Sequence, residues 1–230
     1  MLRNPLVPIV LCAQLGMGAA TADPVVVELF TSQGCASCPP ADAVLGELAG
    51  RDDVIALSLH VDYWDWIGWT DRFARPAFTA RQRAYAEAAR SNVVYTPQFV
   101  VDGVDQIEGA AQMKLAEAIA AHGAASEDVL RMATTSRGRE ALAMPVSGGG
   151  RIVLVTYRPE AQVAIEGGEN AGHELTYRNV VEGWDVLADW DGTEAAFVLP
   201  DPPAGLRQAV IAQAWRDGAP GRILGAVLAD

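Results

Sequence analysis

The sequence predicts an α/β fold, with a central mixed sheet flanked by helices, followed by a smaller all-β, sandwich-like domain. Two observations support this expectation. Up to about residue 124, apolar β-branched runs alternate with alanine-rich segments of helical periodicity. Beyond it, short alternating segments are separated by turn-forming residues. We therefore expect an α/β domain over residues 23–124 and a β-rich C-terminal domain over 125–230.

The elements of the first domain follow one another in a recognisable order. The expected strands and helices are 25–30 (strand), 39–49 (helix), 54–61 (strand), 77–90 (helix), 96–103 (strand), 104–108 (strand) and 110–121 (helix). A β-α-β-α-β-β-α order of this kind is the one expected of a thioredoxin core.

The first residues are typical of a secretory signal. Arg3 precedes an apolar segment from Leu6 to Leu15, and small residues then lead to Ala20-Thr21-Ala22. We expect a signal peptide over residues 1–22, cleaved near Ala22, and a periplasmic or secreted protein. A buried amino-terminal helix is the alternative. No later run approaches the ~20 apolar residues of a membrane span, so none is expected once the signal is removed.

Composition restricts the partners. Half of the 230 residues are hydrophobic and 20% are charged, which favours a globular fold over a disordered chain. The formal net charge is −12. Nucleic acids and anionic membranes are bound through a basic surface, so we expect no nucleic-acid partner.

Two cysteines remain once Cys12 leaves with the signal peptide. Cys35 and Cys38 lie between a predicted strand and a helix opened by Pro39-Pro40. Free N–H groups and the dipole at a helix N-terminus favour a thiolate over a thiol. We expect Cys35 to be a nucleophile that solvent reaches, and Cys38, one helical turn inward, to resolve the mixed disulfide. No cofactor is expected beyond this redox-active disulfide.

Other uses of this spacing stay open. Zinc sites also use Cys-x-x-Cys, but they need four ligands, and the sequence has no second cysteine pair and only scattered histidines. We therefore expect no metal site, although a copper-handling variant with thiol ligands is conceivable. A purely structural disulfide is the other alternative, and its short loop removes little chain entropy.

Thr96-Pro97 is the second candidate element. A proline at the start of a central strand cannot donate to the sheet, so its presence needs a reason. In a thioredoxin fold that reason is a cis peptide bond facing the cysteines, and we predict one here. The backbone of Thr96 would then pair with an extended substrate segment beside Cys35.

Three motifs resemble a known family. They are Val27 to Asp42 (VELFTSQGCASCPPAD), His60 to Asp65 (HVDYWD) and Tyr95 to Gln98 (YTPQ). They resemble the secreted thioredoxin-like family called domain of unknown function 1223, and the resemblance extends to the C-terminus through Gly168 to Gly172. It implies a thioredoxin-like fold, export to the bacterial periplasm and redox activity without an assigned substrate. Gly34 replaces the aromatic residue that precedes the first cysteine in ordinary thioredoxins, so the redox potential does not carry over.

An aromatic loop follows the second predicted strand. Tyr63, Trp64, Trp66 and Trp69 lie close together beside acidic residues. Such density is typical either of a binding surface or of rings that pack on the core. As substrate-binding candidates we take Tyr63, Trp64 and Trp66, together with Thr96.

Three residues are candidates for tuning the cysteine protons. His60 and Asp62 end the second strand at the edge where the cysteine helix begins. Glu28 interrupts an apolar strand, and thioredoxins often place a buried acid near the resolving cysteine. A structural role is the alternative for each of the three, and for Glu28 that role is a salt bridge. The polar segment Glu169 to Glu174 indicates a turn, with a ligand site as the alternative.

Two functions from different classes follow. The first is a periplasmic or secreted thiol–disulfide oxidoreductase in which Cys35 attacks, Cys38 resolves and Pro97 shapes the groove. Its partners would be a protein or small-molecule thiol or disulfide and a redox partner. The second is a non-catalytic binding or assembly module that uses the Trp-rich loop and the β domain, with a metal-handling form as a variant of it.

Overall fold

The computed structural model describes residues 23–216 and 218–229. The expected signal peptide and Cys12 lie outside these residues. The elements of the first half are β1 (Val25–Thr31), α1 (Pro39–Leu48), β2 (Val54–His60), the 3-10 turn η1 (Asp65–Ile67), α2 (Pro76–Ala88), β3 (Gln98–Val101), β4 (Asp105–Glu108) and α3 (Gln112–Ala124). Their order confirms the predicted β-α-β-α-β-β-α sequence of elements.

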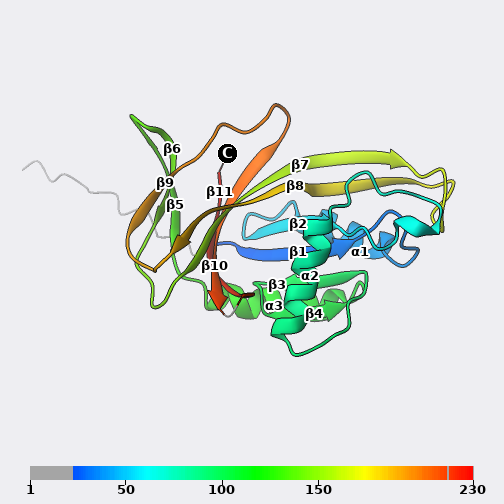
Figure 1. Ribbon diagram of the computed structural model, residues 1–230, viewed down its shortest axis with the longest axis horizontal. Helices are drawn as coiled ribbons and strands as arrows, with labels where there is room; N and C mark the ends of the chain where they lie inside the picture. Colours follow the sequence, from blue (N-terminus) through cyan, green and yellow to red (C-terminus); the bar gives the residue numbers. More distant parts are fainter. Residues whose placement is uncertain (1–22, 217, 230) are drawn as a thin grey trace, which may run out of the picture.

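The second half is built of strands, as expected. They are β5 (Leu130–Thr135), β6 (Gly138–Ala143), β7 (Gly150–Ala164), β8 (Glu174–Trp190), β9 (Ala195–Val198), β10 (Arg207–Arg216) and β11 (Ala219–Leu228). Four of them do not form a separate sandwich. They extend the first sheet, whose strand order is β11-β10-β7-β8-β2-β1-β3-β4 (Figure 1).

The junction between the halves is a parallel contact of β8 with β2, in which Ser58 faces Val180. The second half is all-β, as expected, but four of its strands join the sheet of the first half. Without β8, strand β2 would present a row of unpaired backbone groups, which is the kind of edge that recruits another strand. The β7–β8 hairpin occupies that edge. The domain boundary between residues 124 and 125 stays a prediction.

A second sheet, β5-β6-β9, packs against the large one, where β5 contacts β10 and β11. Leu130 and Ala141 of the small sheet share a buried cluster with Ile152, Leu154 and Val210 of the large sheet. Sandwich-like packing therefore exists, but one of its two layers is the shared sheet.

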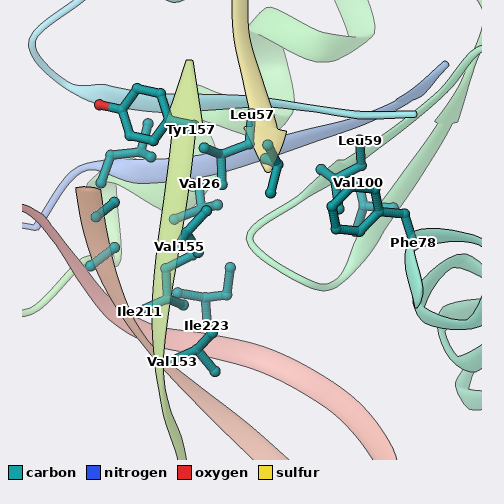
Figure 2. Packing of buried hydrophobic residues seen from close by; sticks show 14 of the residues in the cluster. Val26, Leu57, Leu59, Phe78, Val100, Val153, Val155, Tyr157, Ile211 and Ile223 are labelled. Atoms are coloured by element: carbon teal, nitrogen blue, oxygen red, sulfur yellow. The ribbon is translucent and has the colours of Figure 1, made fainter. Parts of the chain in front are cut away.

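Helices cover both faces of the central strands. Val27 and Leu29 of β1 pack in a cluster with residues of α1 and α3. The alternate residues, Val26 and Phe30, face α2 in a second cluster. Figure 2 shows Val26 in one cluster with Val155 and Ile211, which come from the C-terminal half. The two halves therefore share one core.

The β7–β8 hairpin is long enough to reach the candidate site. In Figure 1 it is the yellow pair of strands that runs past the end of β2. Its turn, residues 165–173, meets the segment that precedes α1, where Asn170 bonds to Gln33. Residues far apart in sequence are thereby brought to the two cysteines.

Candidate functional site

The two cysteines form a disulfide in the turn that joins β1 to α1. Their Cα atoms are 5.4 Å apart. The backbone N–H of Cys38 donates to the carbonyl oxygen of Cys35 at 3.2 Å, and Cys38 is the N-cap residue of the helix. The prolines begin the first turn of α1, as predicted. Cys38 thus precedes the helix instead of lying one turn within it, which corrects the expected position.

Both cysteines are shielded from solvent. Cys35 and Cys38 are each 0% exposed, whereas Ala36 and Ser37 between them are exposed. The expectation that solvent reaches the Cys35 sulfur is therefore wrong for this conformation. For another thiol to react with the disulfide, the residues that shield Cys35 and Cys38 must first move.

The aromatic loop packs against Gly34, the residue before Cys35. A Cβ atom on Gly34 would lie 3.2 Å from Trp64 Cβ and from Ile67 Cδ1. The loop therefore packs directly over the residue before Cys35. This contact explains why glycine stands where ordinary thioredoxins carry an aromatic residue, since a larger side chain would collide with the loop.

The β7–β8 turn contacts the backbone of the cysteine segment. Asn170 is buried, and its Nδ2 donates to the carbonyl oxygens of Gln33 at 2.9 Å and of Cys35 at 3.0 Å. Glu169 Oε2 accepts from the backbone N–H of Ala36 at 3.3 Å. Sequence reasoning assigned this segment to a turn but did not connect it to the cysteines. The only signal was its cluster of polar residues.

Pro97 lies beside the disulfide. The Thr96–Pro97 peptide bond is cis, which confirms that prediction. The Ser37 hydroxyl donates to the carbonyl oxygen of Thr96 at 3.5 Å and lies 3.4 Å from Cys35 Sγ. The structure thus brings Cys35 and Thr96–Pro97 together.

The aromatic residues divide between the two expected roles. Trp64 Nε1 donates to Thr96 Oγ1 at 2.7 Å, and Trp69 Nε1 donates to Gln33 Oε1 at 2.8 Å. The Tyr63 hydroxyl donates to Gln82 on α2 at 3.1 Å. These three rings hold the loop in place. Trp66 is 81% exposed, so its ring is free to contact another molecule.

His60 forms a buried pair with Asp71. Its Nδ1 lies 2.7 Å from Asp71 Oδ2, and both side chains are fully shielded. Asp71 Oδ2 also accepts from the backbone N–H of Gln33 at 2.8 Å. Burial by itself would raise the pKa of Asp71, but His60 and the backbone donors outweigh it and lower that pKa. This pair fixes the segment that leads into the cysteines.

Asp42, four residues after Cys38, is a second buried acid near this pair. Burial raises the pKa of Asp42 to about 7, although His60 partly offsets the effect. Within residues 23–216 and 218–229, neither carboxylate oxygen of Asp42 has a hydrogen-bond partner, nor do His60 Nε2 and the Tyr177 hydroxyl. Sequence reasoning missed Asp42. Its position in the first turn of α1 was the available signal.

Glu28 lies elsewhere. Its carboxylate accepts hydrogen bonds from Arg81 Nη2 at 2.9 Å and from the Tyr85 hydroxyl at 2.6 Å, both on α2. Val27 and Leu29 beside it face α1 on the other side of the sheet. The structure therefore corrects the proton-tuning role predicted for Glu28 and favours the salt-bridge alternative.

Asp62 also bonds away from the cysteines. Its Oδ1 accepts from the Thr79 hydroxyl on α2 at 2.6 Å, and its backbone N–H donates to the same hydroxyl oxygen at 3.2 Å. Asp62 thus connects the start of the aromatic loop to α2. A proton-tuning role for Asp62 has no contact to support it.

Comparison with known proteins places the chain in a family. Residues 26–213 match the family described as "Protein of unknown function (DUF1223)". The chain belongs to this family. This DUF1223 chain is similar in structure to protein AGR_C_4864 from Agrobacterium tumefaciens, with 32% identity, coverage of 90% of this chain and 94% of that chain, and a TM-score of 0.78. It shares its fold with HBP35 of Porphyromonas gingivalis, at 15% identity, 90% and 74% coverage and a TM-score of 0.57. No curated protein matched.

Two searches of the described part of the chain found nothing. None of its helices combines the length and apolar character needed to cross a bilayer. Within the same residues, no three or more His, Cys, Asp or Glu side chains are grouped so that they could hold a metal ion.

Proposed function

We propose that this chain is a thioredoxin-fold thiol–disulfide oxidoreductase that acts in the periplasm or after secretion. The observation that carries the proposal is the Cys35–Cys38 disulfide beside the cis Thr96–Pro97 peptide, with Ser37 bridging the two. The β-α-β-α-β-β-α order of the first half supports the thioredoxin assignment. The proposed location rests on the signal-like residues 1–22.

The proposed reaction moves two electrons between the disulfide and a substrate dithiol. A substrate thiolate attacks Cys35 Sγ, the bond to Cys38 breaks, and Cys38 Sγ keeps the electron pair and takes up a proton. The second substrate thiolate then attacks the substrate sulfur of the mixed disulfide. Cys35 leaves as a thiolate, and the substrate departs as a disulfide. The reverse sequence reduces a substrate disulfide.

The first residue attacked should be Cys35. Ala36 and Ser37 beside it are exposed, and Ser37 Oγ lies 3.4 Å from Cys35 Sγ. A hydroxyl at that distance can donate to the thiolate when Cys35 leaves, which favours the charged form. Cys38 is followed directly by Pro39 and α1, so it is the inner of the two sulfurs and suits the resolving role.

Trapping of the mixed disulfide tests the proposal. The Cys38→Ser variant should accumulate a mixed disulfide through Cys35, because its thiolate attacks a substrate disulfide such as oxidised glutathione and releases one substrate thiol, and the Cys35→Ser variant should not. Both are compared with the unaltered chain by mass spectrometry under identical glutathione buffers. If none of the three exchanges with glutathione or with a protein dithiol, the oxidoreductase proposal fails.

A binding or assembly module is the second candidate. It is favoured by the complete burial of Cys35 together with the 81% exposure of Trp66. In this case the disulfide only stabilises the turn, and Trp66 contacts a partner. Replacing both cysteines by serine should then leave partner binding intact, whereas Trp66→Ala should abolish it.

A further inference from the structure

The β7–β8 turn occupies the backbone groups that surround Cys35. Asn170 Nδ2 donates to the carbonyl oxygens of Gln33 and Cys35, and Glu169 accepts from the N–H of Ala36. An extended polypeptide that docks beside a strand or turn uses backbone N–H and C=O groups of the same kind. The turn therefore makes the hydrogen bonds that a bound polypeptide would make.

The turn also sits tightly on the aromatic loop. A Cβ atom on Gly167 would lie 2.5 Å from the carbonyl oxygen of Gly68, so only glycine allows this approach. Trp64, in that loop, donates to Thr96. The turn and the loop thus pack on the residues around Cys35, whose exposure is 0%.

We propose that Glu169 and Asn170 make this site selective for extended polypeptides over small thiols. This inference rests on the proposed oxidoreductase function and names its substrate class. A polypeptide offers N–H groups to the carbonyls that Asn170 releases and a C=O group to the N–H that Glu169 releases. It therefore displaces the turn without leaving those groups unpaired. A small dithiol such as dithiothreitol carries no such groups. It therefore reacts with Cys35 only after the turn has opened spontaneously.

The experiment compares two reductants acting on the oxidised full-length chain. One is dithiothreitol, and the other is an unstructured peptide that carries two reduced cysteines. The variants are Asn170→Ala, the isosteric Asn170→Asp and Glu169→Ala, which removes the acceptor for the Ala36 N–H. Glu166→Gln is the matched control, because Glu166 is exposed in the same turn. Free thiols are alkylated at intervals and counted by mass spectrometry.

The unaltered chain should react faster with the peptide than with dithiothreitol. Losing the hydrogen bonds of Asn170 should raise the dithiothreitol rate by about tenfold, because one or two net hydrogen bonds are worth roughly that factor. The peptide rate should change less, so the preference for the peptide should shrink. The control should behave like the unaltered chain.

Two results would overturn the inference. Equal dithiothreitol rates in all variants would mean that the turn does not limit access. An equal increase for both reductants would mean that it limits access without selecting a substrate. Thermal unfolding of each variant is measured beforehand, and if both Asn170 variants fail to fold, Glu169→Ala decides. Failure of the oxidoreductase proposal looks different, because neither the unaltered chain nor the uncovered variants would then form a mixed disulfide with any thiol.

Discussion

The side-chain amide of Asn170 donates a 3.0 Å hydrogen bond to the carbonyl oxygen of Cys35, across 135 residues of chain. The candidate site is consequently made by both halves of the molecule. The first half supplies the disulfide and Thr96–Pro97, and the second half supplies the turn that covers them. This dependence on both halves leads to the first prediction.

The first half should not fold cooperatively by itself. A chain of residues 23–124 lacks β8, which covers the edge of β2, and lacks Ile211 and Ile223, which share a core with Val26. Exposing that core removes apolar burial worth about 25 cal/mol per Å². We expect weak near-ultraviolet circular dichroism and no sharp thermal transition, in contrast to residues 23–230. A cooperative transition in the fragment would contradict the shared core.

Asp42→Asn should stabilise the protein above neutral pH. Burial raises the pKa of Asp42 to about 7 in the folded chain, from an ordinary value of 3.8 that we take for the unfolded chain. The folded state therefore binds the proton more tightly. The stability that protonated Asp42 contributes is fully present below its unfolded-state pKa of 3.8. It is lost as pH rises through its folded-state pKa of about 7. A difference of about three pKa units corresponds to about 4 kcal/mol.

The measurement is the free energy of unfolding in urea from pH 4 to pH 8 for both proteins. Asp23, whose pKa burial raises to about 6, is present in each, so the difference isolates Asp42. The asparagine variant should show the flatter profile and the higher stability at pH 8. Parallel profiles would contradict the prediction.

Glu28→Gln should weaken folding without changing the chemistry of the disulfide. The variant leaves the guanidinium of Arg81 buried without its charged partner, and breaking a buried pair costs about 3–5 kcal/mol. The pH dependence of disulfide reduction should stay that of the unaltered chain, because Glu28 faces α2. A shifted reduction profile would restore the proton-tuning role. Glu160→Gln, which breaks a half-exposed pair with Arg178, should cost no more than about 1 kcal/mol.

Trp64 and Trp66 should respond differently to substitution. Trp64→Phe removes the hydrogen bond to Thr96 Oγ1 and should lower the unfolding free energy by about 1 kcal/mol. Trp66→Ala removes a ring that is 81% exposed, so stability should stay within about 0.5 kcal/mol. Urea unfolding measures both changes. Iodide quenching of tryptophan fluorescence should lose its most accessible component only in the Trp66 variant.

Local patterns predicted the elements of the first half well. Pro39-Pro40 indicated the start of α1, and the position of Pro97 before a central strand indicated its cis bond. Both signals lie within a few residues of the structure that they specify. The proline pair at α1 is a local signal, whereas the cis bond was inferred from the place of Pro97 in a thioredoxin-like order of elements.

Local patterns could not predict which face of a strand a helix covers, or which distant strands pair with each other. Alternation along β1 separates Glu28 from Val27, but the sequence does not say which side α1 covers. The joining of β8 to β2 is specified by a pairing between Ser58 and Val180, which no local pattern marks. The contact of Asn170 with Cys35 depends on that pairing, and so it was missed too.

The long β7–β8 hairpin has a consequence for the order in which the site is assembled. A nascent chain made only as far as Ala164 already contains Cys35 and Cys38 but lacks Glu169 and Asn170. The contacts of Glu169 and Asn170 with the cysteine segment therefore form only after both residues have been synthesised, more than a hundred residues after Cys38.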